Sequence, residues 1–144
     1  MPAHDPDPLA SAETFLRDRA LTYPEATEDF PWGHRSIKVK AKLFLILARA
    51  DDVLTVTVKL PESNSYALMQ RYAEPTGYGL GKSGWVSCRF RTGDELPLDL
   101  LEEWIEESFR AVAPKKLILA LNAREAGDPE PPPAKPKRGP KKKK

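Results

Sequence analysis

Basic side chains recur along three segments of the chain that contain no acidic residue. The segments His34–Arg49, Val53–Leu60 and Trp85–Arg91 together hold eight lysines and arginines. Cationic side chains suit phosphate groups, because each phosphate that they neutralise releases condensed counterions. These residues therefore favour the binding of a phosphate-rich ligand.

An alternation of apolar and polar residues predicts that these segments are β-strands. Ser36–Lys42, Val53–Leu60 and Trp85–Arg91 alternate with a period of two. Leu43–Ala50 is almost wholly apolar, and it either continues the first strand or forms another after a tight turn at Ala41-Lys42. The residues expected to face the core are Ile37, Val39, Val56, Val58, Val86 and Phe90. The opposite face would then show Lys38, Lys40, Lys42, Thr55, Thr57, Lys59, Ser87, Arg89 and Arg91.

The candidate nucleic-acid contacts of the folded part come from these strands and from the loop before the last of them. They are Arg35, Lys38, Lys40, Lys42, Lys59, Tyr78, Lys82, Trp85, Arg89 and Arg91. A structural alternative exists, because lysine on a solvated strand also prevents edge-to-edge aggregation. That alternative applies above all to Lys38 and Lys40.

The glycine-rich loop between Thr76 and Trp85 ends in Gly81-Lys82-Ser83, which is similar to the end of a phosphate-binding P-loop. A P-loop needs a glycine where Thr76 stands and a helix after the Lys-Ser pair, whereas here a strand begins at Trp85. The loop therefore predicts a flexible connection rather than a nucleotide site. Its Tyr78, Lys82 and Trp85 remain candidates for contact with a base or a phosphate.

No group of residues has the composition of a catalytic or metal centre. Cys88 is the single cysteine and alternates with core-facing residues, so a buried and unreactive thiol is expected. The histidines His4 and His34 are too far apart to form a local ligand pair. Four glutamates at helical spacing, Glu102, Glu103, Glu106 and Glu107, are typical of a solvated helix face. We expect a protein without enzymatic activity, cofactor or metal.

The remaining periodicities predict helices around the strands. Helices are expected at Pro8–Leu21, Glu62–Tyr72, Pro97–Val112 and Lys115–Leu121, with an irregular segment from Thr22 to His34. Strands joined by short turns indicate an antiparallel sheet, and apolar alternation on one face places the helices on that face. The predicted fold is a two-layer α+β domain over residues 9–122, after a disordered leader at residues 1–8.

The C-terminal segment, residues 123–144, separates from the domain by composition. It holds six of the 15 prolines. Its eight basic residues and three acids give it a net charge of +5, so residues 1–122 have a net charge of −3 and the whole chain +2. We expect this tail to be disordered. Its candidate phosphate contacts are Lys137, Arg138, Lys141, Lys142, Lys143 and Lys144. The alternative is a tail that only improves solubility.

Hydropathy gives no sign of a membrane. No apolar run approaches the roughly 20 residues of a spanning helix, and the polar, proline-containing start of the chain has no signal-peptide core. We therefore expect a cytoplasmic protein without a membrane partner.

Several of these segments together resemble the MmcQ/YjbR family. The resemblance lies in Tyr23–Gly33, Ile37–Phe44, Val58–Pro61 and Gly77–Val86, with Glu107-Ser108-Phe109 in the closing helix, and it covers about residues 9–122. It implies a CyaY-like fold, also described as a double-wing domain, and a non-enzymatic DNA-binding protein. Where the family usually has a glycine before the lysine at position 42, this chain has Ala41.

Two functions from different classes fit this sequence. The first is DNA binding by the basic strand face and the lysine-rich tail. The second is a module that binds a protein or a small ligand and carries a merely solubilising tail. The second gains support from the scarcity of aromatic residues among the basic ones, because proteins that bind single strands usually stack bases on aromatic rings.

Overall fold

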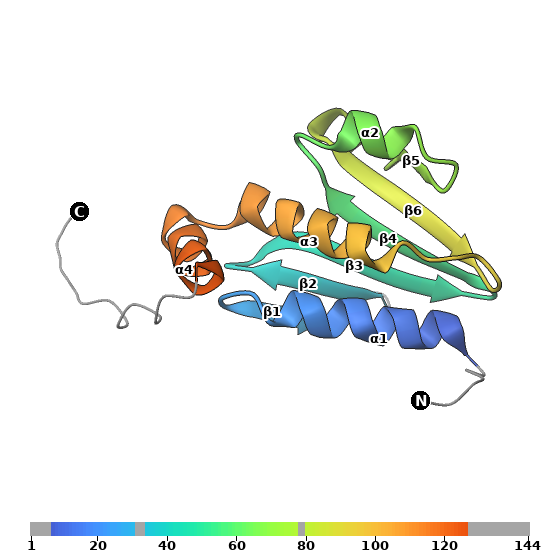
Figure 1. The fold of residues 1–144 in the computed structure, drawn as a ribbon, viewed down its shortest axis with the longest axis horizontal. Helices are drawn as coiled ribbons and strands as arrows, with labels where there is room; N and C mark the ends of the chain where they lie inside the picture. The colour runs from blue at the N-terminus through green and yellow to red at the C-terminus, as the bar shows by residue number, and fades with distance from the viewer. Residues whose placement is uncertain (1–6, 31–33, 78–79, 127–144) are drawn as a thin grey trace, which may run out of the picture. The chain divides into compact units, whose positions relative to one another are not determined.

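The structure is a computed structural model that describes residues 7–30, 34–77 and 80–126. Its centre is an antiparallel sheet of six strands in the order β1-β2-β3-β4-β6-β5 (Figure 1). The strands are β1 (Ala26–Asp29), β2 (Arg35–Val39), β3 (Lys42–Ala50), β4 (Val53–Lys59), β5 (Ala73–Pro75) and β6 (Trp85–Arg91). β2, β4 and β6 are the strands that the alternating pattern predicts, and the apolar run forms the separate strand β3 after a tight turn, the second of the two alternatives.

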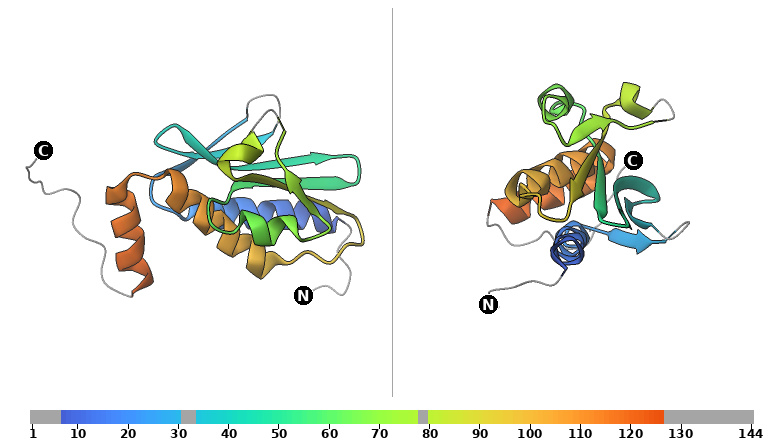
Figure 2. Two further views of the ribbon diagram at one scale, coloured as in Figure 1. Left: turned by 90° about the horizontal axis from the view of Figure 1, so that it is seen from above. Right: turned by 90° about the vertical axis from the view of Figure 1, so that its right-hand side faces the viewer.

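Two helices cover one face of this sheet. They are α1 (Pro8–Leu21) and α3 (Leu98–Val112), which contact each other and the central strands (Figure 2). The short helices α2 (Asn64–Leu68) and η2 (Leu80–Ser83) lie beside β5 and β6. The predicted α+β class, with an antiparallel sheet and helices on one face, is therefore confirmed. We call the face opposite α1 and α3 the outer face.

The core lies between the sheet and these helices. Phe109 of α3 stacks on Tyr23 with ring centroids 4.9 Å apart, and meets the ring of Phe44 edge-on at 5.3 Å. The six strand residues predicted to face the core, from Ile37 to Phe90, are all buried. Ser108 secures α3 to the sheet, because its hydroxyl donates to the Phe44 carbonyl and accepts from the Lys59 amide at 2.8 Å.

The turn between β2 and β3 lies one residue earlier than the sequence suggests. Val39 pairs with Lys42, so the turn consists of Lys40 and Ala41, both with positive φ (51° and 66°). A turn of this kind matches the twist of the two strands, although glycine or asparagine is the usual occupant. A register shift follows between Ile37 and Lys38, where β3 has an extra residue.

This turn corrects the predicted position of two lysines. Lys40 lies in the turn itself, and Lys42 pairs with the buried Val39 on the side of the sheet that α1 and α3 cover. Neither residue belongs to the outer face, although strict alternation from Lys38 to Lys42 places both there. Lys38 does lie on the outer face, opposite Leu43.

Two edge strands were not predicted, and both contain acidic residues. Ala26–Asp29 forms β1 within the segment expected to be irregular, and Ala73–Pro75 forms β5 directly after the expected helix Glu62–Tyr72, of which only Asn64–Leu68 is helical. Both are short and gain their order from pairing with β2 and β6. Such strands have too few residues for an alternation to be visible.

Contacts divide the chain into two units, residues 1–113 and 114–144. The described element of the second unit is α4 (Lys115–Glu125), which ends four residues later than predicted. Residues 1–6 of the leader expected at residues 1–8, and residues 127–144 of the tail expected at residues 123–144, lie outside the described residues. Pro8 already belongs to α1, and α4 includes residues 123–125. Within the part of the chain that is described, no helix is long and apolar enough to cross a membrane.

Candidate nucleic-acid interface

The outer face can be assigned from the strand register. Thr55 of β4 pairs with Arg89 of β6, Val53 pairs with Arg91, and Lys59 pairs with Trp85. Residues paired across antiparallel strands share a face. The neighbouring Phe90 packs on Tyr72, whose ring also contacts Trp104 of α3, so Phe90 is on the helix side. Because side chains alternate, Arg89 and Arg91 lie on the outer face.

Five predicted contact residues therefore share the outer face. They are Lys38, Lys59, Trp85, Arg89 and Arg91. Lys82 is exposed on η2, next to β5 and β6. Tyr78 and the tail residues Lys137, Arg138, Lys141, Lys142, Lys143 and Lys144 lie outside the described residues.

Arg35 is placed differently from the other predicted contacts. It pairs with the buried Leu47 on the helix side of the sheet. Its guanidinium donates to Glu13 of α1 at 2.7 Å and to Glu28 of β1 at 2.8 Å. These hydrogen bonds raise the pKa of Arg35. Arg35 is thus a structural residue that joins α1 to the sheet.

Arg49 and Arg17 extend the same ion-pair network. Arg49 bonds Glu13 at 3.0 Å and Asp7 at 3.3 Å, while Arg17 bonds Glu28 at 2.9 Å. The shared carboxylates are well covered, with 13% of the Glu13 side chain and 10% of the Glu28 side chain exposed. Arg17, Arg35 and Arg49 therefore all form ion pairs with carboxylates at the junction of α1 and the sheet.

Three hydroxyl groups form a hydrogen-bonded cluster on the outer face. The Thr57 and Ser87 hydroxyls lie 3.1 Å apart, and Thr76 reaches Ser87 at 3.0 Å from the segment after β5. Thr57 and Ser87, which the alternation places on an exposed face, are only 6% exposed. The cations Lys59 and Arg89 lie on the same face, two residues along the strand from Thr57 and Ser87 respectively.

The edge strands bring two carboxylates to the outer face. Asp29 of β1 bonds Lys38 at 3.3 Å, and Glu74 of β5 forms an ion pair with Arg89. Among the charged residues of the described strands, this face therefore holds four cations and two anions. For Lys59 and Arg91 no ion pair is found within the described residues. The three basic segments of the sequence contain no acid, but the sheet also includes β1 and β5, which contribute Asp29 and Glu74.

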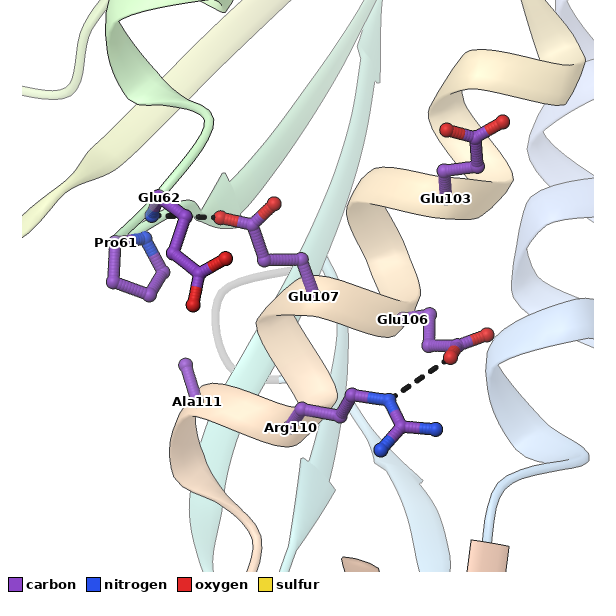
Figure 3. A pocket seen from close by; sticks show the side chains of 7 residues that line it. All are labelled: Pro61, Glu62, Glu103, Glu106, Glu107, Arg110 and Ala111. Atoms are coloured by element: carbon purple, nitrogen blue, oxygen red, sulfur yellow. Dashed lines mark hydrogen bonds and ion pairs between the residues drawn. The ribbon is translucent and has the colours of Figure 1, made fainter. Parts of the chain in front are cut away.

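Three glutamates of α3, namely Glu103, Glu106 and Glu107, border a hollow of about 370 Å³ (Figure 3). Glu107 accepts hydrogen bonds from the Glu62 and Ser63 amides, each at 2.9 Å, and Glu106 pairs with Arg110 at 2.9 Å. Glu107 therefore joins α3 to the segment before α2, whereas Glu106 forms an ion pair within α3. No group of three metal-ligating side chains exists among the described residues.

Cys88 is fully buried on β6, which confirms the predicted burial of its thiol. Burial raises the pKa of its thiol to about 12. An unfolded cysteine ionises near pH 8.5–9, so between these values the folded state holds a proton that the unfolded state releases. The free energy of unfolding must therefore fall as the pH rises from about 9 to 12.

Replacing Cys88 by alanine is expected to remove this pH dependence. The difference in unfolding free energy between the wild type and Cys88→Ala should narrow by about 2 kcal/mol between pH 8 and pH 10.5. Urea unfolding of both proteins across this pH range measures the difference. Subtracting one unfolding free energy from the other cancels the contributions of the other titrating groups. A difference that stays constant would mean that the thiol ionises equally in both states.

Comparisons with known proteins agree with this architecture. A model of the YjbR family matches residues 21–111. The crystal structure of protein DR2400 from Deinococcus radiodurans, with a DUF419 domain, superposes with a TM-score of 0.58 at 25% identity, over 79% of this chain and 86% of that one. A protein from Pseudomonas syringae gives 0.52 at 18% identity, over 69% and 96%. No curated protein matches the chain.

Proposed function

The chain belongs to the YjbR family, and on that premise we propose that it is a DNA-binding protein whose outer face and basic tail contact backbone phosphates. The observation that carries the proposal is the position of Lys59 and Arg91 on the outer face of the two adjacent strands β4 and β6. Both helices that complete the core pack on the other side (Figure 2). Phosphates can therefore approach these cations without unfolding any element.

The spacing of the cations suits an extended anion. Lys59 lies opposite Trp85 at one end of β6, and Arg91 is at the other end, six residues away. At about 3.3 Å per residue this separation is roughly 20 Å. Phosphates of one DNA strand follow each other at about 3.4 Å along the duplex axis, so the face spans several of them.

The tail adds positive charge to that of the outer face. Its six clustered basic residues between Lys137 and Lys144 can each neutralise a phosphate and release counterions. Contacts of this type are independent of base sequence. The proposed binding is therefore non-specific and steeply dependent on salt.

A salt series on the full chain tests the proposal. Fluorescence anisotropy of a labelled 30-base-pair duplex is measured at several salt concentrations between 50 and 300 mM. We expect saturable binding at 50 mM, with the logarithm of the affinity falling linearly as the logarithm of the salt concentration rises. No binding at 50 mM would contradict the proposal.

Arg35→Ala and Arg91→Ala form a matched pair that separates structure from binding. Arg35→Ala removes one ion-pair partner from each of the well-covered carboxylates of Glu13 and Glu28. The free energy of unfolding should therefore fall by about 2 kcal/mol. The DNA affinity should change less than about twofold. Arg91→Ala should leave stability within about 0.5 kcal/mol and weaken binding several-fold. Urea unfolding and anisotropy measure the two effects. The opposite pattern would place the interface on the helix side.

A second candidate function rests on exposed apolar side chains at α2. Tyr66, Leu68 and Met69 are exposed, Met69 by 79%, although α2 also packs on α3 through the ring contact of Tyr66 with Trp104. Apolar side chains gathered on a surface favour contact with another protein. If the full chain does not bind DNA, this surface supports a protein-interaction module instead.

A further inference from the structure

Two cations of the outer face, Lys38 and Arg89, are each paired with a carboxylate of an edge strand. We propose that Glu74 and Asp29 act as internal competitors of the DNA backbone, each holding an outer-face cation until a phosphate replaces it. This inference rests on the DNA-binding function proposed above and concerns the regulation of the same site.

The register places each carboxylate on the same face as its cation. Glu74 pairs with Ser87, two residues before Arg89, so both side chains point to the outer face. Asp29 pairs with Ser36, two residues before Lys38, and the same relation holds at the opposite edge of the sheet. Each edge strand thus supplies one acid to the neighbouring strand's cation.

Exposure makes these pairs exchangeable. The Arg89 side chain is 51% exposed and the Glu74 side chain 52% exposed. In the other pair, the Asp29 side chain is 61% exposed beside Lys38. Exposed pairs contribute little to stability, so a phosphate can displace the carboxylate at small cost to the fold. The Arg35 network differs, because its acids are covered at the helix–sheet junction.

The Asp29 carboxylate is charged near neutral pH. The backbone amide of Phe30 and then the ammonium of Lys38 lower the pKa of Asp29. A charged acid beside its cation reduces the attraction for a weak or singly charged anion, while a polyanion such as DNA can still compete. The edge acids therefore select for dense phosphate over isolated anions.

Glu74→Gln tests the inference, because it keeps the size of the side chain and removes only its charge. In the full chain we expect binding to a 30-base-pair duplex about three- to tenfold tighter at 150 mM salt. The slope of log affinity against log salt should become steeper by about 0.9, the value for one added phosphate contact. Arg89 must supply that contact, so Arg89→Ala combined with Glu74→Gln should not show the steeper slope.

Glu103→Gln is the matched control, since it makes the same charge change at an exposed position on α3. We expect it to change affinity less than twofold and to leave the slope unaltered. Equal tightening by both variants would overturn the inference, because net charge alone would then explain the gain.

The failures of the two proposals are distinguishable. If Arg91→Ala weakens binding and Glu74→Gln has no effect, internal competition is wrong while DNA binding stands. If the unmodified chain does not bind the duplex at 50 mM salt, both proposals fail together.

Discussion

A chain that ends at Ala126 is expected to bind duplex DNA at least about 100-fold more weakly than the full chain in 50 mM salt. The deletion removes the six basic residues clustered between Lys137 and Lys144. If each contacts one phosphate, the slope of log affinity against log salt should become shallower by about 5. Anisotropy titrations of both chains across a salt series measure affinity and slope together.

The end point Ala126 follows from the structure, because α4 continues to Glu125 and a deletion after Asn122 would cut the helix. A matched control is the full chain with its last four lysines, Lys141 to Lys144, replaced by glutamine. Its slope should become shallower by roughly two-thirds of the change expected for the deletion. Equal slopes for the full and shortened chains would show that the tail only improves solubility.

Phe109→Ala is expected to lower the free energy of unfolding by about 4 kcal/mol. The Phe109 ring is fully buried and contacts both Tyr23 and Phe44, which come from different parts of the chain. Removing a buried phenylalanine loses its transfer free energy and leaves a cavity, at a cost of about 3–5 kcal/mol. Urea unfolding followed by circular dichroism measures the change.

Met69→Ala is the control for this substitution, because the Met69 side chain is 79% exposed. Its unfolding free energy should stay within about 0.5 kcal/mol of the wild type. A Phe109→Ala loss below about 1 kcal/mol would contradict the account of the core, in which α3 is held to the sheet by this aromatic cluster.

Alternation predicts a strand best when one of its faces is covered. Val53–Lys59 and Trp85–Arg91 have buried apolar residues on the helix side and mostly polar residues opposite, and both strands appear where the sequence predicts them. β1 and β5 have four and three residues, too few to show a period, and their order comes from pairing with β2 and β6.

The sequence predicts correctly which basic residues of β4 and β6 lie on the outer face, but not where Lys40, Lys42 and Arg35 lie. A basic residue in a strand pattern does not reveal which face it occupies once a turn or a register shift intervenes, as at Lys40 and Lys42. Arg35 has the residue type of a phosphate contact, but its partners are Glu13 and Glu28, 22 and 7 positions away. Only tertiary structure brings these charges together.

The central claim is that DNA contacts the outer face, and amide chemical shifts of the full chain test it most directly. The isotope-labelled protein is titrated with a 30-base-pair duplex in 100 mM salt. We expect the largest shift changes within the described residues at Lys59, Arg89 and Arg91, with little change along α1 and α3. Changes concentrated on α1 and α3, or confined to the tail, would contradict the claim.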